Sequence, residues 1–280
     1  MAMDVIEHHA AQLPALDDRW EPRPYERDEL RRALLDAAIA GPQVSHPLDN
    51  VLRHIELLYE GDPDKQFAMT RLAGALSPRK ILDLVGAEAG FEPDHTATHG
   101  PVPVDPDHVL DRCQAVGDRL RLACRRGETV VLATGHPVGL AHLYAEVGRE
   151  LARRGARPLR PAEGEKWREE GRHHWWQIRY LGHVAVLTDK ASARHTHSGE
   201  PMRRMLAYAV PGVVFADHGF AGTAIEQGID TVSIADVNDP ALILAKAQGR
   251  TEVVIVMDDN VQPDTYWPCF QAIVSRLPAA

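Results

Sequence analysis

The chain has 280 residues, of which 44% are hydrophobic and 25% charged, an ordinary globular composition with enough apolar residues for a normal core. Its formal net charge of −9 argues against a nucleic-acid-binding protein, because such proteins carry a basic surface. Three scattered cysteines, no apolar stretch of ~20 residues and no signal-peptide pattern together predict a soluble, cytoplasmic protein without a disulfide framework, a zinc cluster or a membrane partner.

The first part of the chain is predicted to be helical. Residues 1–28 are expected to form an irregular arm, because Pro22 and Pro24 interrupt any helix there. Residues 90–107 are rich in glycine and proline, which predicts a loop. Apolar residues at helical spacing predict helices that begin at Asp28, after Pro47, at Asp64 (running to Leu76), at Pro78 with Ser77 as N-cap, and after an N-cap at Asp107.

The second part alternates short apolar runs with helical patterns. Residues 177–180 and 183–187 read as a hairpin, and the polar residues 162–175 are expected to form a mobile excursion or lid. A series of strands and short helices favours a parallel sheet covered on both faces. We therefore predict an α/β protein, with a helical N-terminal region over residues 1–125 and an α/β domain over residues 126–280 that carries the site. Its sheet is expected to be mixed, mainly parallel and Rossmann-like, with helices on both faces.

Five of the apolar runs end in polar clusters of the same kind. In an open parallel sheet, ligands bind beyond the carboxyl ends of the strands, so we expect the chemistry at these positions. The clusters are Thr134-Gly135-His136, Thr188-Asp189-Lys190, Asp217-His218-Gly219, Asp236 with Asn238-Asp239, and Asp258-Asp259-Asn260.

Two strand-to-helix turns are candidates for phosphate binding. Glycine-rich turns of this kind aim backbone N–H groups and the positive end of a helix dipole at one point. The alternatives are a tight turn capped by His136 and a helix capped by Asp217 without a catalytic role. The residues predicted to bind phosphate in these turns are Thr134, Gly135, Gly139, Gly219, Gly222 and Thr223.

The carboxylates at the strand ends predict a metal site. Several carboxylates at one sheet edge repel each other unless some are protonated, point away or surround a cation. Oxygen ligands of this kind suit Mg²⁺, or Mn²⁺ where a histidine joins them. Asp239 is interpreted as an N-cap, and the adjacent Asp258 and Asp259 are expected to point in opposite directions. The predicted ligands are Asp217, Asp236, Asp258 and Asn260.

Residues 190–198 concentrate cations, hydroxyls and histidines. Lys190 and Arg194 are predicted to neutralise a phosphate, while His195 and His197 share one side of an extended chain and suit metal binding or proton transfer. The alternative is a polar loop that caps the helix after Glu200. The predicted catalytic residues of the whole chain are His136, His197, Asp217 and His218.

These segments, taken as a set, resemble a family of actinobacterial proteins labelled phosphatase. The resemblance covers roughly residues 125–265 and is carried by Ala-Thr-Gly-His-Pro-Val-Gly-Leu, His-Thr-His-Ser-Gly-Glu-Pro-Met, Asp-His-Gly-Phe-Ala-Gly-Thr-Ala, Ala-Asp-Val-Asn-Asp-Pro-Ala and Met-Asp-Asp-Asn-Val. A helical cap over strand ends that carry Asp and Asn is also similar to the metal-dependent damage-control phosphatases, although this chain has no clear copy of their Asp-Asn-x-Gly-Glu motif.

The resemblance and the residues together predict a metal-assisted phosphatase that hydrolyses a phosphate monoester of a small molecule. The attacking group is left open between water and an aspartate, and homo-oligomerisation is left open as well. The alternative is a non-catalytic protein that binds a sugar phosphate or a nucleotide, because a fold alone implies no chemistry. The carboxylate cluster favours the enzyme, since mere phosphate binding gains nothing from it.

Overall fold

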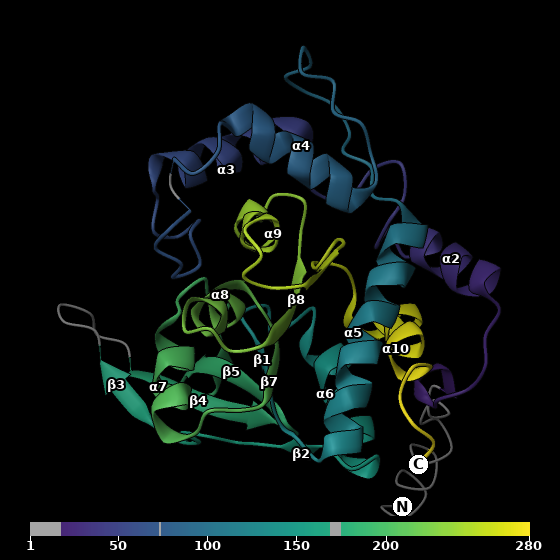
Figure 1. Cartoon of the computed structure of the whole chain (residues 1–280), viewed down its shortest axis with the longest axis vertical. Helices are drawn as coiled ribbons and strands as arrows, with labels where there is room; N and C mark the ends of the chain where they lie inside the picture. The colour runs from purple at the N-terminus through teal and green to yellow at the C-terminus, as the bar shows by residue number, and fades with distance from the viewer. Residues whose placement is uncertain (1–17, 73, 169–174) are drawn as a thin grey trace, which may run out of the picture.

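The computed structural model describes residues 18–72, 74–168 and 175–280 (Figure 1). Of the predicted irregular arm, residues 1–17 lie outside the described part. The N-terminal region is helical, as expected. Its elements are η1 (Asp18–Trp20), α2 (Arg27–Asp36), α3 (Leu48–Glu60), α4 (Pro78–Ala89) and α5 (Pro106–Arg126).

Two helix starts show what local sequence determines. Ser77 caps α4 as predicted, because its side chain accepts a hydrogen bond from the backbone N–H of Lys80. The cap of α5 was predicted two residues too late. Asp105, followed by a proline, occupies the N-cap, while the carboxylate of Asp107 instead binds Arg27 of α2 at 2.8 Å.

The predicted helix from Asp64 to Leu76 is wrong. The described residues of this segment form turns and bends, and Phe67 and Ala68 have φ angles of +49° and +64°. Non-glycine residues seldom adopt such angles, and the surrounding packing must hold them there. The backbone oxygen of Phe67 packs so closely on Gly222 that any side chain at Gly222 would clash with it. Tertiary docking has therefore overridden the local helical pattern.

The sheet is mixed and mostly parallel, as predicted. Its strands follow the order β3-β4-β5-β1-β7-β8-β9, with β2 paired to β1 and β6 paired to β5. The predicted hairpin is confirmed as the antiparallel pair β4 and β5, and β5, β1, β7, β8 and β9 run parallel to one another. The strands are β1 (Thr129–Thr134), β2 (Arg157–Pro158), β3 (Lys166–Arg168), β4 (Trp175–Leu181), β5 (Val184–Asp189), β6 (Ser192–Ala193), β7 (Val213–Asp217), β8 (Thr231–Ala235) and β9 (Val253–Val256).

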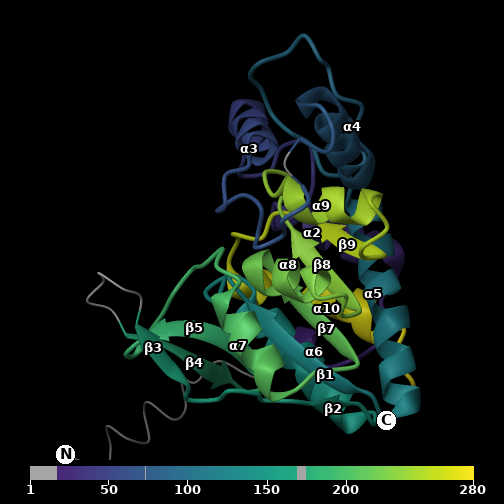
Figure 2. The same cartoon turned by 60° about the vertical axis from the view of Figure 1, so that its left-hand side comes forward.

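Helices cover both faces of the sheet (Figures 1 and 2). α8 and α9 pack on one face, whereas α6, α5 and α10 pack together on the other. The polar segment predicted as a lid, residues 162–175, begins with a turn and continues into β3 on the sheet edge; its residues 169–174 lie outside the described part. The remaining helical elements are α6 (Ala141–Arg153), α7 (Glu200–Tyr208), α8 (His218–Glu226), α9 (Pro240–Ala247), η2 (Pro263–Tyr266) and α10 (Trp267–Val274).

The strand order places one crevice at the carboxyl ends of β1 and β7. After β1 the chain goes on to β5, on one side of β1, and after β7 it goes on to β8, on the opposite side of β7. The connections that follow the neighbouring strands β1 and β7 therefore run in opposite directions along the sheet. Such a switch point is where open α/β sheets bind ligands. α3 and α4 lie beyond this end of the sheet, next to α9 (Figure 1).

The hydrophobic core joins both parts of the chain. Buried side chains of the N-terminal helices, such as Leu34 and Val85, belong to the same cluster as Val131 and Val214 of the strands. The division at residue 125 therefore stays a prediction. All three cysteines are buried and free. No helix among the described residues is both long and apolar enough to cross a membrane.

Candidate functional site

A cavity of about 520 Å³ opens at the switch point. This volume lies within the range of sites that bind small molecules. One part of its lining comes from strand ends and the other from the N-terminal region. The lining residues are His46, Asn50, His54, Lys65, His136, Pro137, Val138, Ala193, His195, His197, His218, Asn238, Asp239, Asp259 and Asn260.

His218 stands at the junction of β7 and α8, in the middle of the site. Its φ of +46° is unusual for a histidine and turns the chain sharply from strand to helix. The fully buried Asp217 accepts a hydrogen bond from the backbone N–H of Gly135 at 2.6 Å and lies 2.7 Å from Nδ1 of His218 through the same oxygen. Nδ1 is therefore engaged, and Nε2 faces the cavity.

Two acidic side chains approach Nε2 of His218. Oδ2 of Asp239 lies 3.4 Å away and Oδ2 of Asp259 lies 3.8 Å away. Asp239 does occupy the N-cap position of α9, but its side chain makes no capping hydrogen bond. The interpretation of Asp239 as a helix cap is therefore wrong for its side chain, which faces the cavity instead.

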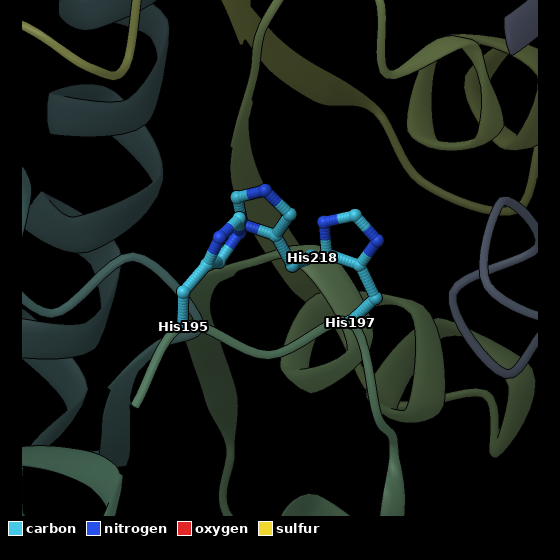
Figure 3. A group of neighbouring side chains, drawn as sticks. All are labelled: His195, His197 and His218. Atoms are coloured by element: carbon cyan, nitrogen blue, oxygen red, sulfur yellow. The ribbon is translucent and has the colours of Figure 1, made fainter. Parts of the chain in front are cut away.

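Three histidines gather at the same place (Figure 3). His195 and His197 come from the loop between β6 and α7, and their rings meet that of His218 from either side. A potential ligand nitrogen of each lies within 4.8 Å of the others, and the same holds for His218 with Asp239 and Asp259. The ring of His136 stacks on that of His218 at 5.8 Å.

Hydrogen-bond partners orient several of the histidines. Nδ1 of His197 lies 2.9 Å from a carboxylate oxygen of Asp64, and Nδ1 of His54 lies 2.8 Å from the backbone oxygen of Asn238. In His197, His54 and His218 alike, Nδ1 is engaged by a protein oxygen and Nε2 is left to bind a metal ion or a substrate. Histidines that ligate metals are commonly held in this way.

Adjacent Asp258 and Asp259 point apart, as predicted. Asp259 faces the cavity, whereas Asp258 accepts hydrogen bonds from the backbone N–H groups of Ser45 at 2.8 Å and Asn260 at 3.0 Å. Asp258 thus fastens the N-terminal region to the end of β9. Asp236 is buried, and its Oδ2 lies 3.5 Å from Nε2 of His46.

Burial and crowding strongly perturb the acids. Burial, opposed by His218 but reinforced by Asp239, raises the pKa of Asp259 to about 8. Burial also raises the pKa of Asp236 well above its usual value, with Asp259 and Asp258 adding to the effect. Both carboxyls therefore hold protons more tightly than a solvated aspartate as long as no cation is near them.

The histidines are perturbed in both directions. Burial alone would lower the pKa of His218, but Asp239, Asp217 and Asp259 outweigh it and raise that pKa to about 10. Burial and the positive charge of His218 lower the pKa of His195 to about 4 and also lower the pKa values of His136 and His197. Three neutral imidazoles thus surround one cationic imidazole.

The chemistry of these side chains fits a divalent cation. Buried oxygens of Asp236 and Asp259 make no hydrogen bond within the described part of the chain, and such atoms are costly unless something binds them. Neutral imidazole nitrogens and carboxylate oxygens are metal ligands, and an ion at Nε2 of His218 would have to displace the proton that the metal-free site holds there. Two groups of residues have the spacing to hold an ion, and they share His218: His195 and His197 with His218, and Asp239 and Asp259 with His218.

The structure brings some predicted metal ligands closer to this cluster than others. Asp217 contacts Nδ1 of His218, the ring nitrogen on the side away from the cavity. Asp258 binds backbone N–H groups, and Asn260 lines the cavity. Asp236 lies beside His46. In the part of the chain that the structure describes, neither Asp236 nor Asp258 belongs to a group of three side chains with ligand spacing.

The glycines predicted to bind phosphate serve close packing. A side chain at Gly135 would strike the backbone oxygen of Thr196, and one at Gly139 would strike that of Asp259. Gly219 and Gly222 are closed off in the same way by the backbone oxygens of His197 and Phe67. These turns hold the site together by letting neighbouring segments approach.

The other predicted phosphate ligands also have protein partners. The hydroxyl of Thr134 accepts the backbone N–H of His136 at 2.9 Å, and that of Thr223 donates to the backbone oxygen of Gly199 at 3.2 Å. Arg194 pairs with Asp189 at 3.3 Å. Lys190 lines a separate hollow with Lys166, Trp175 and Gln177 rather than the main cavity.

Sequence reasoning missed the contribution of the N-terminal region. His46, Asn50, His54 and Lys65 line the cavity, and Oδ1 of Asn50 accepts a hydrogen bond from the side chain of Asn238 at 2.8 Å. One signal was available, because Asn50 and His54 are four residues apart and share a face of α3 beside its buried residues. Lys65 gave no such signal, since its segment read as a helix.

Two comparisons with known proteins give a match over most of the chain. A model of the family described as Phosphatase matches residues 25–280. The Streptomyces coelicolor protein named Phosphatase SCO2771 is 33% identical over 252 residues, which cover 88% of this chain and 94% of that protein. No solved structure matches the chain.

Proposed function

Because the chain belongs to this phosphatase family, we propose that it hydrolyses phosphate monoesters of small molecules with the help of divalent metal ions bound in the cavity. The observation that carries the proposal is a pair of candidate ligand groups that share His218: His195 and His197 join it in one group, and Asp239 and Asp259 join it in the other. Such a cluster of buried acids is costly to a protein that only binds an anion, and a cation turns it into an advantage.

The ligand set bears on the choice of metal. Oxygen ligands alone favour Mg²⁺, whereas imidazole nitrogens favour transition metals. Of the two ions expected from the sequence, Mg²⁺ and Mn²⁺, the three histidines favour Mn²⁺. A bound ion of this kind lowers the pKa of water and stabilises charge on a phosphoryl oxygen.

The protein's own groups would divide the remaining work. Asp217 and Asp64 hold His218 and His197 in fixed orientations, so the nitrogens that face the cavity are placed in advance. His136 also lines the cavity, and its lowered pKa keeps it neutral at physiological pH. It can therefore accept a proton from the attacking water or, once protonated, give one to the leaving oxygen.

The cavity lining favours a small polar substrate. It contains asparagine and histidine side chains, and no tryptophan, tyrosine or phenylalanine is among the described lining residues. Trp175, which could stack on a substrate ring, lies in the separate hollow with Lys190. We expect a sugar or polyol phosphate rather than a nucleotide, because the rings available for stacking on a base are histidines, and several of them are proposed metal ligands.

A panel of phosphate esters, assayed before and after EDTA treatment and after addition of Mn²⁺ or Mg²⁺, tests the proposal. We expect chelation to abolish hydrolysis and Mn²⁺ to restore it. Asp259→Asn should lose both bound metal and activity, whereas Asp264→Asn, an exposed aspartate five residues later, should retain both. Full activity after chelation, or in Asp259→Asn, would contradict metal dependence. Binding of phosphate esters without any turnover would favour the non-catalytic alternative.

A further inference from the structure

Substrate phosphate needs positive charge in a cavity that is lined by acids. Of the cations expected to supply it, Lys190 lines a separate hollow and Arg194 pairs with Asp189. Among the described residues that line the cavity, Lys65 is the one lysine or arginine. Its position therefore bears directly on how a phosphate ester would be held.

Lys65 is held close to the histidine cluster. Its side chain is only 12% exposed, and Nζ lies 3.1 Å from Oδ2 of Asp64. The same oxygen of Asp64 lies 2.9 Å from Nδ1 of His197. One carboxylate oxygen thus joins the ammonium group to a candidate metal ligand.

The segment that carries Lys65 is firmly docked on the α/β part. The ring of Phe67 contacts His197 at 5.0 Å and His218 at 5.2 Å, and its backbone oxygen packs on Gly222. Thr70 of the same segment donates a hydrogen bond to Glu226 at 2.5 Å. These contacts fix the lysine beside the cluster although they require positive φ angles at two residues.

We propose that Lys65 is the phosphate anchor of the cavity and donates hydrogen bonds to an oxygen of the substrate's phosphate group. An ammonium group has three donors, so it can keep its contact with Asp64 and still bind an anion. This role rests on the proposed function for the substrate class. Binding of inorganic phosphate tests it without turnover.

The experiment compares Lys65→Met with Lys80→Met in the metal-loaded protein. Lys80 is an exposed lysine on α4 that also pairs with a nearby aspartate, so it is a matched control. Calorimetry would measure binding of inorganic phosphate, and metal analysis would measure metal content. Loss of a hydrogen bond from a charged group predicts about 10- to 100-fold weaker phosphate binding in Lys65→Met, with unchanged metal content. Lys80→Met should bind as the unaltered protein does, and Lys65→Arg should bind better than Lys65→Met.

Three outcomes would overturn the proposal. One is equal phosphate binding by Lys65→Met and the unaltered protein when both give the same thermal melt. Another is loss of metal from Lys65→Met, because Lys65 would then act through Asp64 and His197. The third is a metal-loaded, unaltered protein that does not bind phosphate. The proposed function would fail separately, if phosphate bound through Lys65 but no ester was hydrolysed.

Discussion

The two walls of the cavity differ in composition and in origin. The strand-end wall, formed by residues 134–139, 193–198, 217–218, 236–239 and 258–260, holds the acids and the histidine cluster. The N-terminal wall, formed by His46, Asn50, His54 and Lys65, holds one ammonium group, two imidazoles and one amide. The first wall offers ligands for a metal, and Lys65 of the second offers a donor for a substrate. The sheet would thus supply the chemistry, and the added helical region the selectivity.

The largest expected effect separates two adjacent residues of the strand-end wall. Asp259→Asn removes a cavity-facing ligand, and we expect metal affinity and kcat/KM to fall by at least about 100-fold. Asp258→Asn weakens the attachment of Ser45, which should cost about 1–3 kcal/mol of stability but leave metal affinity unchanged. Metal titration and denaturant unfolding of both variants give the answer. If Asp258→Asn lost more metal affinity than Asp259→Asn, Asp258 rather than Asp259 would be the ligand, and the prediction would be wrong.

The second prediction compares the two carboxylates that orient histidines, one behind each wall. Asp217→Asn and Asp64→Asn should each weaken metal binding by about 10- to 100-fold, because an oriented imidazole loses its charged partner. Asp217 is fully buried and also binds Gly135, so its variant should be less stable as well. Because the side chain of Asp64 is 58% exposed, the substitution Asp64→Asn should cost little stability. Equal metal affinity in Asp64→Asn and the unaltered protein would show that the N-terminal wall does not help to bind metal.

The third prediction concerns the contact that joins the two walls. Gly222→Ala places a methyl group against the backbone oxygen of Phe67, so the segment that carries Lys65 must move. We expect a stability loss of about 1–3 kcal/mol and a several-fold rise in KM, with a smaller change in kcat. Gly212→Ala is the milder control, because its methyl group would be tight rather than overlapping: its closest contact is 3.2 Å to Cβ of Glu128, whereas the methyl group of Gly222→Ala would overlap the backbone oxygen of Phe67. An unchanged KM in a correctly folded Gly222→Ala would separate the docking of this segment from substrate binding.

The strand-end wall could be predicted from the sequence for a simple reason. Parallel strands end at one edge of a sheet, so recognising the strands that end at Thr134 and Asp217 already brings their tips together. The pattern does not say which way each tip side chain points. The sequence alone therefore favours a helix cap for the side chain of Asp239, and it does not distinguish Asp258 from Asp259 as a ligand. Such choices depend on contacts made by other segments, as with Ser45 on Asp258.

The N-terminal wall could not be predicted in this way. Its residues reach the cavity only because the helical region packs on the end of the sheet, and no local pattern encodes that packing. The segment around Lys65 illustrates this, because its apolar spacing suggests a helix while docking on Gly222 enforces turns. The glycines show a related limit of the sequence. Gly219 and Gly222 are needed for close approach of the protein's own backbone, which the sequence does not distinguish from the approach of a phosphate.

The smallest predicted effect is on the stability of the metal-free protein as a function of pH. Asp259 has a folded pKa of about 8, whereas an unfolded aspartate releases its proton near its usual 3.8. The folded state therefore holds more protons between pH 4 and 8, and stability falls as pH rises through this window. His218 extends the fall from about pH 6.5 to 10, because its folded pKa is about 10 and the ordinary value is 6.5.

Denaturant unfolding at a series of pH values would measure this decline in stability. The same measurement on Asp259→Asn and Asp64→Asn compares what the two carboxylates contribute to it. Asp259→Asn should flatten the decline between pH 4 and 8, for a gain of at least about 1 kcal/mol at pH 8 in the metal-free protein. In Asp64, burial is outweighed by His197 and Lys65, which lower the pKa, so Asp64 contributes stability above its unfolded pKa and loses it as pH falls. Asp64→Asn should therefore leave the decline between pH 4 and 8 in place. A flat pH profile in the unaltered metal-free protein would mean that the acids of the strand-end wall are not strained by one another, and the main physical reason for a bound cation would be lost.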